Sequence, residues 1–95
     1  MKRIVEKYRL FIKPSARKEL LGLPKDVKTR SQLIIDTLSE QPRPRGYKKL
    51  FGYTNLYRIR IGSYRIIYEI EDSVKTVRVL AVKHRKDVYK SIYFQ

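Results

Sequence analysis

The sequence predicts an α+β fold in which an N-terminal strand, a two-helix hairpin and a three-stranded antiparallel meander build one twisted sheet covered by helices. Two observations support this class. The first half of the chain has one alternating run followed by two segments of helical periodicity, and the second half has three strand-like runs separated by short turns. Because 95 residues can bury only one modest core, we expect residues 1–95 to form a single domain.

The first expected strand lies within "EKYRLFIK", residues 6–13. Its apolar side chains, Tyr8, Leu10 and Ile12, alternate with charged or polar ones. Alternation with a period of two is typical of a strand that buries one of its faces. Pro14 follows directly and is expected to end the strand.

Two helices are expected next. Ser15 is placed to cap a short helix, "ARKELLG", which closes at Gly22. Pro24 then stands where the first position of a helix tolerates proline, at the start of a second helix within residues 24–41. The apolar stripe of this second helix comprises Val27, Ile34 and Leu38, widened by Leu33 and Ile35.

The second half of the chain supplies the sheet that these helices cover. Pro42 and Pro44 end the second helix and stiffen "QPRPRGY" into a loop. Three strand-like runs follow, at 55–61, 64–71 and 76–83, with "EDSVK" as the turn between the last two. A short tail, "KHRKDVYKSIYFQ", completes the chain.

The first two of these runs form a hairpin around Gly62 and Ser63, a two-residue loop with glycine first, which is typical of a type II′ turn. Arg58, Arg60 and Arg65 then share one face, although like charges set opposite each other destabilise a hairpin. The opposite face becomes the core side of the hairpin. Its register pairs Ile61 with Tyr64, Ile59 with Ile66 and Tyr57 with Tyr68.

The composition favours an anionic partner. There are 23 Lys and Arg against 9 Asp and Glu, so the formal net charge is +14, and this excess repels itself unless a polyanion is bound. A membrane partner is not expected, because no apolar stretch is long enough to span a bilayer. The chain has no cysteine and no apolar N-terminal leader, so we expect a cytoplasmic protein without disulfides or thiol chemistry.

The arginine face predicts phosphate binding. A guanidinium group can bind two phosphate oxygens at once and can stabilise negative charge that develops on the phosphate, but it does not accept protons. Within "VKHRKDVY", His84 carries an imidazole and Tyr89 carries a phenol, so either could exchange a proton, although each also has an ordinary packing role. No metal-ligand cluster, serine elbow or phosphate loop is present, so the expected chemistry uses neither metal nor cofactor.

"KKLFGYTNLYRIRIGSYRIIYEI" followed by "VLAVKHRKDVY" resembles the RelE branch of the RelE/ParE toxin superfamily. The resemblance extends over nearly the whole chain. It implies a microbial-ribonuclease-like RelE fold and a toxin of a type II toxin-antitoxin system. The implied activity is metal-independent cleavage of messenger RNA in the ribosomal A site, by attack of the substrate's 2′-hydroxyl on the adjacent phosphate. The implied partners are the ribosome with its mRNA and a cognate antitoxin, and the free toxin is expected to be a monomer.

The resemblance also implies which residues act. The catalytic positions are Arg58, Arg60, Arg65, Arg85 and Tyr89, to which the chemistry adds His84 as a second candidate for proton transfer. RNA contacts are expected from four lysines, namely Lys48, Lys49, Lys83 and Lys86.

Two features depart from the family pattern. Well-studied RelE enzymes have lysines where this chain has Arg58 and Arg60, so His84 or Tyr89 would carry more of the proton transfer. Lys83 stands where a small residue, usually glycine, precedes the His-Arg pair. Two alternatives therefore stay open: a ParE-like inhibitor that binds DNA gyrase, and a non-catalytic RNA-binding relative.

Overall fold

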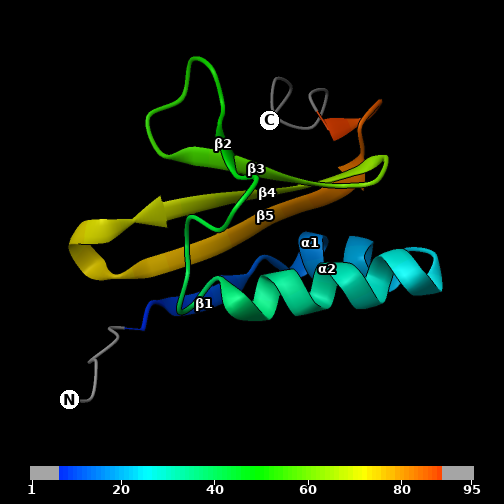
Figure 1. Cartoon of the computed structure of the whole chain (residues 1–95), viewed down its shortest axis with the longest axis horizontal. Coiled ribbons are helices and arrows are strands. Elements are labelled where there is room, and N and C mark those ends of the chain that lie inside the picture. Colours follow the sequence, from blue (N-terminus) through cyan, green and yellow to red (C-terminus); the bar gives the residue numbers. More distant parts are fainter. Residues whose placement is uncertain (1–6, 89–95) are drawn as a thin grey trace.

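The computed structural model describes residues 7–88 (Figure 1). It confirms the α+β class. No helix within these residues is long and apolar enough to cross a membrane. The elements in chain order are β1 (Arg9–Ile12), α1 (Pro14–Leu21), α2 (Lys25–Thr37), β2 (Lys48–Lys49), β3 (Leu56–Ile61), β4 (Tyr64–Glu71), the 3-10 turn η1 (Asp72–Val74) and β5 (Thr76–His84).

One sheet of five strands runs through the molecule in the order β1-β5-β4-β3-β2. The predicted meander of β3, β4 and β5 is confirmed, and the N-terminal strand β1 pairs in parallel with β5. The sequence did not predict β2, which has only 2 residues and is too short for an alternating pattern. Strand β2 pairs only with Tyr57 and Arg58 of β3. From Ile59 onward, the edge of β3 that faces away from β4 therefore has no strand beside it among the described residues.

Figure 1 shows both helices on one side of the sheet, here called the helix face, and the loop between β2 and β3 on the other side, here called the open face. The main core lies between the sheet and the helices. It contains Ala16, Leu20, Ile35, Leu38, Ile59, Ile61, Ile66, Tyr68, Ile70, Val77, Val79 and Val82. A second, smaller apolar cluster on the open face contains Leu50, Ile67, Ala81 and Val88.

The register predicted for the hairpin is confirmed. Ile61 pairs with Tyr64, and Arg60 lies directly opposite Arg65. Gly62 has a φ of 58° and Ser63 does not share this left-handed conformation, which is the combination of a type II′ turn. A register shifted by one residue would bury the arginines among the core side chains, so the hydrophobic pattern fixes the pairing.

Three predictions about the helix ends were wrong. Helix α1 begins at Pro14 with Lys13 as its N-cap, so Ser15 lies inside the helix and does not cap it. Proline is favoured at this first position because the N–H that it lacks would have no partner within the helix. Pro24 is the N-cap of α2 and not its first residue, and α2 ends at Thr37, before Pro42 is reached.

The predicted apolar stripe of α2 was right except at Leu33. Ile35 and Leu38 are fully buried, whereas the Leu33 side chain is 61% exposed. Leu33 precedes Ile35 by two residues, which places it about 200° around the helix and away from the sheet. The core side of the helix is completed by Ser31, which is fully buried.

Replacement of Ser31 by alanine is expected to leave stability unchanged or to raise it by about 0.5–1 kcal/mol. The Ser31 hydroxyl is buried and has no hydrogen-bond partner within residues 7–88, so it loses its hydration without compensation. Alanine also has the higher helix propensity. Urea unfolding of both proteins measures the difference, and a loss of more than 1 kcal/mol in the S31A variant would contradict the explanation.

A polar network ties the loop after α2 to the far end of the sheet. The Arg43 guanidinium donates to both carboxylate oxygens of Asp72, at 3.2 and 2.8 Å, and the Tyr8 hydroxyl donates to the same carboxylate at 2.6 Å. Arg43 also lies over the ring of Tyr57, 5.4 Å from its centroid. The hydrogen bond from Arg43, followed by that from Tyr8, lowers the pKa of Asp72 from 3.8 to about 2.

This network predicts a specific loss of stability in acid. Because the pKa of Asp72 is lower in the folded protein, the unfolded chain binds the proton first as the pH falls, so the contribution is complete above pH 4 and is lost between about pH 4 and pH 2. Both side chains are partly exposed, so the loss is at most about 1 kcal/mol. Urea unfolding at several pH values should show a shallower acid dependence in D72N than in wild type; identical slopes would contradict the assignment.

Candidate nucleic-acid interface

A groove of about 630 Å³ lies beside the β3-β4 hairpin. We call it the basic groove, because arginine and lysine make up much of its lining and no carboxylate belongs to it. Phosphate groups are the natural ligands of such a surface. The groove is lined by Ile34, Arg45, Gly46, Lys48, Arg58, Ile59, Arg60, Gly62 and Arg65.

Strand pairing brings these cations together. Arg60 and Arg65 are direct partners across the hairpin, and Lys48 of β2 is the direct partner of Arg58. Arg58 and Arg60 are two residues apart on β3 and therefore point to the same side. The three hairpin arginines that the sequence grouped thus lie in one groove, together with one of the predicted lysines.

The turn carbonyl of Gly62 holds two of these like charges next to each other. It accepts a hydrogen bond from Arg60 Nε at 3.2 Å and another from an Arg65 terminal nitrogen at 3.1 Å. The same Arg65 nitrogen donates to the Tyr64 carbonyl at 2.9 Å. These hydrogen bonds fix the position of both guanidinium groups beside the turn.

Positive charge on the open face is neutralised away from the hairpin turn. Arg78 of β5 is paired with Glu69 at 2.5 Å and with Glu71 at 3.6 Å, both from β4. No ion pair to Arg58 or Arg60 is found among the described residues. An approaching polyanion is therefore attracted to the hairpin end of the sheet.

Lys83 is also ion-paired, although the sequence predicts it as an RNA contact. Its Nζ lies 2.5 Å from one carboxylate oxygen of Glu19 on α1, and the other oxygen accepts the Val82 N–H at 3.0 Å. Glu19 thereby satisfies the edge of β5 beyond the end of β1. An RNA contact by Lys83 would require this ion pair to be exchanged for a phosphate.

The structure does not bring His84 to the arginine face. His84 pairs with Tyr64, whose neighbours in the alternation point to the helix face, and the two rings meet edge to face with centroids 5.4 Å apart. The His84 Nδ1 accepts the Lys86 backbone N–H at 3.2 Å, which leaves Nε2 as the donor in the neutral ring. Tyr89, the other candidate for proton transfer, lies outside the described residues.

The end of β5 lies beside the hairpin turn, as the combined site requires. The Arg85 backbone N–H donates to the Ser63 carbonyl at 2.7 Å. The side chains of Arg85 and Lys86 are exposed there, close in the chain to the strand that carries Lys83. Over residues 7–88 no three His, Asp or Glu side chains lie close enough together to hold a metal ion.

Residues 10–89 match the family model described as the ParE toxin of the type II toxin-antitoxin system parDE. The chain belongs to the RelE/ParE toxin superfamily. The toxin RelE3 of Methanocaldococcus jannaschii is 39% identical over 77 residues, which are 76% of this chain and 84% of that protein. The toxin RelG of Mycobacterium tuberculosis is 30% identical over 84 residues, covering 87% of this chain and 97% of that protein.

A solved structure of the superfamily has the same fold. The archaeal RelE-RelB complex from Pyrococcus horikoshii contains a chain that is 36% identical and superimposes with a TM-score of 0.73. The match covers 83% of this chain and 96% of that one. The expected RelE-like fold is therefore confirmed.

One cation of the basic groove was not predicted from the sequence. Arg45 lines the basic groove from the loop after α2, next to Gly46, which has a φ of 91°. The signal available was the basic, proline-rich stretch "QPRPRGY", but nothing in its spacing indicates which way the loop folds. The loop is held by Tyr68, whose buried hydroxyl donates to the Pro42 carbonyl at 2.8 Å, and by the bonds from Arg43 to Asp72.

Proposed function

We propose that this chain is the toxin of a type II toxin-antitoxin system and that it cleaves messenger RNA in the ribosomal A site. The observation that carries the proposal is the basic groove, in which arginines from two strands and a loop face a cavity without any carboxylate. The similarity to proteins named RelE supports it. The cytoplasm, where translating ribosomes are found, is the compartment that this activity requires.

The proposed chemistry uses the RNA as its own nucleophile. The 2′-hydroxyl attacks the adjacent phosphate, the P–O bond to the 5′-oxygen of the next nucleotide breaks, and a cyclic phosphate and a 5′-hydroxyl are formed. Arg65 and Arg85 would bind the scissile phosphate, supported by Arg58 and Arg60, and would stabilise its extra negative charge in the transition state. His84 or Tyr89 would exchange the two protons.

The orientation of the His84 side chain makes it the less suitable of these two candidates for proton transfer. The His84 ring packs on Tyr64 and points to the helix face, so it would have to rotate around the end of β5 to reach a phosphate held by Arg65. His84 is therefore better suited to packing than to proton transfer, and Tyr89, which lies outside the described residues, is the candidate that we favour.

The proposed partners are the ribosome and an antitoxin. A chain with a formal net charge of +14 suits the ribosomal RNA around the A site. The Pyrococcus horikoshii relative was solved as a complex of RelE with RelB, which supports an antitoxin partner for this chain as well.

Expression of the chain without an antitoxin tests the function. We expect growth arrest together with new 5′ ends in translated mRNA at a constant position within codons, mapped by sequencing of 5′-hydroxyl ends. Growth arrest with intact mRNA would contradict the proposal.

A gyrase inhibitor is the second candidate, because the matching family model is described as a ParE toxin. The two activities are separated by DNA supercoiling with purified gyrase. Full inhibition by a stoichiometric amount of the chain, without cleavage of translated mRNA, would favour the second candidate.

A further inference from the structure

Phe51 is a fully exposed aromatic residue outside the basic groove. Its side chain is 100% exposed, although the residues around it are anchored. Leu50 is buried and Tyr53 is packed against the small apolar cluster on the open face. The loop is closed by backbone hydrogen bonds from Leu50 to Leu56, at 2.9 Å, and from Tyr53 to Leu50, at 3.3 Å. A fixed loop therefore presents a single aromatic ring to solvent.

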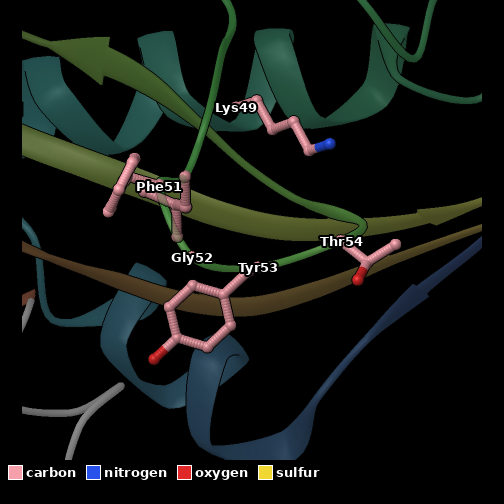
Figure 2. A pocket seen from close by; sticks show the side chains of 6 residues that line it. Lys49, Phe51, Gly52, Tyr53 and Thr54 are labelled. Atoms are coloured by element: carbon pink, nitrogen blue, oxygen red, sulfur yellow. The ribbon is translucent and has the colours of Figure 1, made fainter.

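The loop also surrounds a hollow of its own. Figure 2 shows the residues that line it, a space of about 530 Å³. The lining combines one cation, two aromatic rings, a leucine, a glycine and a threonine, and contains no carboxylate. It consists of Lys49, Leu50, Phe51, Gly52, Tyr53 and Thr54.

This hollow and the basic groove both border strand β2. Lys48 lines the groove and the adjacent residue, Lys49, lines the hollow, so strand β2 contributes to both. The loop enters β3 at Leu56, which is about 13 Å along the strand from Arg60. A single-stranded chain of a few nucleotides whose phosphates lie in the basic groove can reach the loop.

We propose that Phe51 stacks on an unpaired nucleobase of the RNA that the basic groove holds. This inference rests on the proposed function. An exposed aromatic ring beside cations is how proteins bind single-stranded nucleic acid, because every base has an apolar face that can stack. Phe51 would position the strand, while the arginines contact phosphate.

A protein partner suits this loop less well. A protein contact needs a continuous apolar patch, whereas the exposed neighbours of Phe51 in the hollow are Lys49, Gly52 and Thr54. Exposed leucines gather on the helices instead, where Leu21 and Leu33 line a separate hollow of about 340 Å³.

Binding of a short, fully 2′-O-methylated RNA strand tests the proposal, since this probe cannot be cleaved by its own 2′-hydroxyl. Measured by fluorescence anisotropy over a salt series, Phe51→Ala should weaken binding by about 5- to 100-fold without changing the salt slope. Phe51→Trp, which keeps an aromatic ring at this position, should bind with an affinity close to that of wild type. Lys49→Gln should instead lower the salt slope by about one. Leu33→Ala, which removes another exposed apolar side chain, is the control and should bind like wild type.

The possible outcomes separate the inference from the function. Wild-type affinity in Phe51→Ala, or a loss that Phe51→Trp does not restore, would overturn the stacking role. A loss of antitoxin binding in Phe51→Ala with RNA binding unchanged would assign the loop to the protein partner and also overturn it. Failure of the wild-type chain to cleave translated mRNA would contradict the proposed function alone, because binding to the 2′-O-methylated strand does not depend on cleavage.

Discussion

Arg65→Ala is expected to reduce cleavage of translated mRNA by about 10²- to 10³-fold, the usual cost of removing one charged or hydrogen-bonding group that stabilises a transition state. Arg65 lies in the basic groove opposite Arg60, and the carbonyls of Gly62 and Tyr64 hold its guanidinium in place. Single-turnover cleavage of mRNA on programmed ribosomes measures the effect. The rate should fall further than the affinity for the ribosome, because the negative charge grows only in the transition state.

Arg78→Ala is the matched control. It removes an arginine from the same sheet, but Arg78 is already paired with Glu69 and Glu71 and lies away from the groove. Its cleavage rate should stay within about threefold of wild type. The free energy of unfolding of the Arg65→Ala variant should also lie within about 1 kcal/mol of the wild-type value, because the lost hydrogen bonds are offset by relief of the repulsion from Arg60. Equal rates for the two variants would contradict a catalytic role for Arg65, and weakened binding alone would indicate a non-catalytic RNA-binding protein.

The arginine site was predictable because its geometry follows from the alternation of a single hairpin. Once Gly62 and Ser63 are taken as the turn, each residue of β3 has one partner on β4, and the hydrophobic pattern permits no other register. The family resemblance indicated what these residues do. Their positions on one face follow from the alternation of side chains along each strand.

The sequence was a weaker guide wherever the answer depends on contacts between distant segments. Tyr68 helps to hold the loop that carries Arg45 to the groove, and Lys83 is paired because α1 places Glu19 at the edge of β5. Such features are set by packing and not by local pattern, so periodicity cannot separate them.

Tyr68→Ala is expected to cost about 3–5 kcal/mol, the largest effect on stability that we predict. Tyr68 is fully buried in the main core, and its ring lies 5.9 Å from that of Tyr57. A domain of this size has about 5–15 kcal/mol of stability in total, so the variant should be close to unfolding at 37 °C. Urea unfolding monitored by circular dichroism measures the loss.

Tyr68→Phe removes only the hydroxyl and tests whether this buried group helps to position the basic groove. Burial raises the pKa of Tyr68, so the phenol stays protonated and keeps donating to the buried Pro42 carbonyl. Removing this donor leaves the carbonyl unsatisfied, at a cost of about 1–2 kcal/mol. The loop that begins at Pro42 carries Arg45 into the groove, so RNA affinity should fall as well, although every arginine is still present.

Tyr57→Phe is the control for this coupling, because the Tyr57 hydroxyl takes only a long hydrogen bond of 3.5 Å from Arg43. It should cost less stability and leave RNA affinity nearly unchanged. If both variants bind RNA equally, the loop is held by other contacts and the coupling is wrong. If only Tyr68→Phe binds weakly, then a buried hydroxyl on the helix face sets the position of a cation in the groove. The basic groove would then depend on the core as well as on the hairpin that carries most of its arginines.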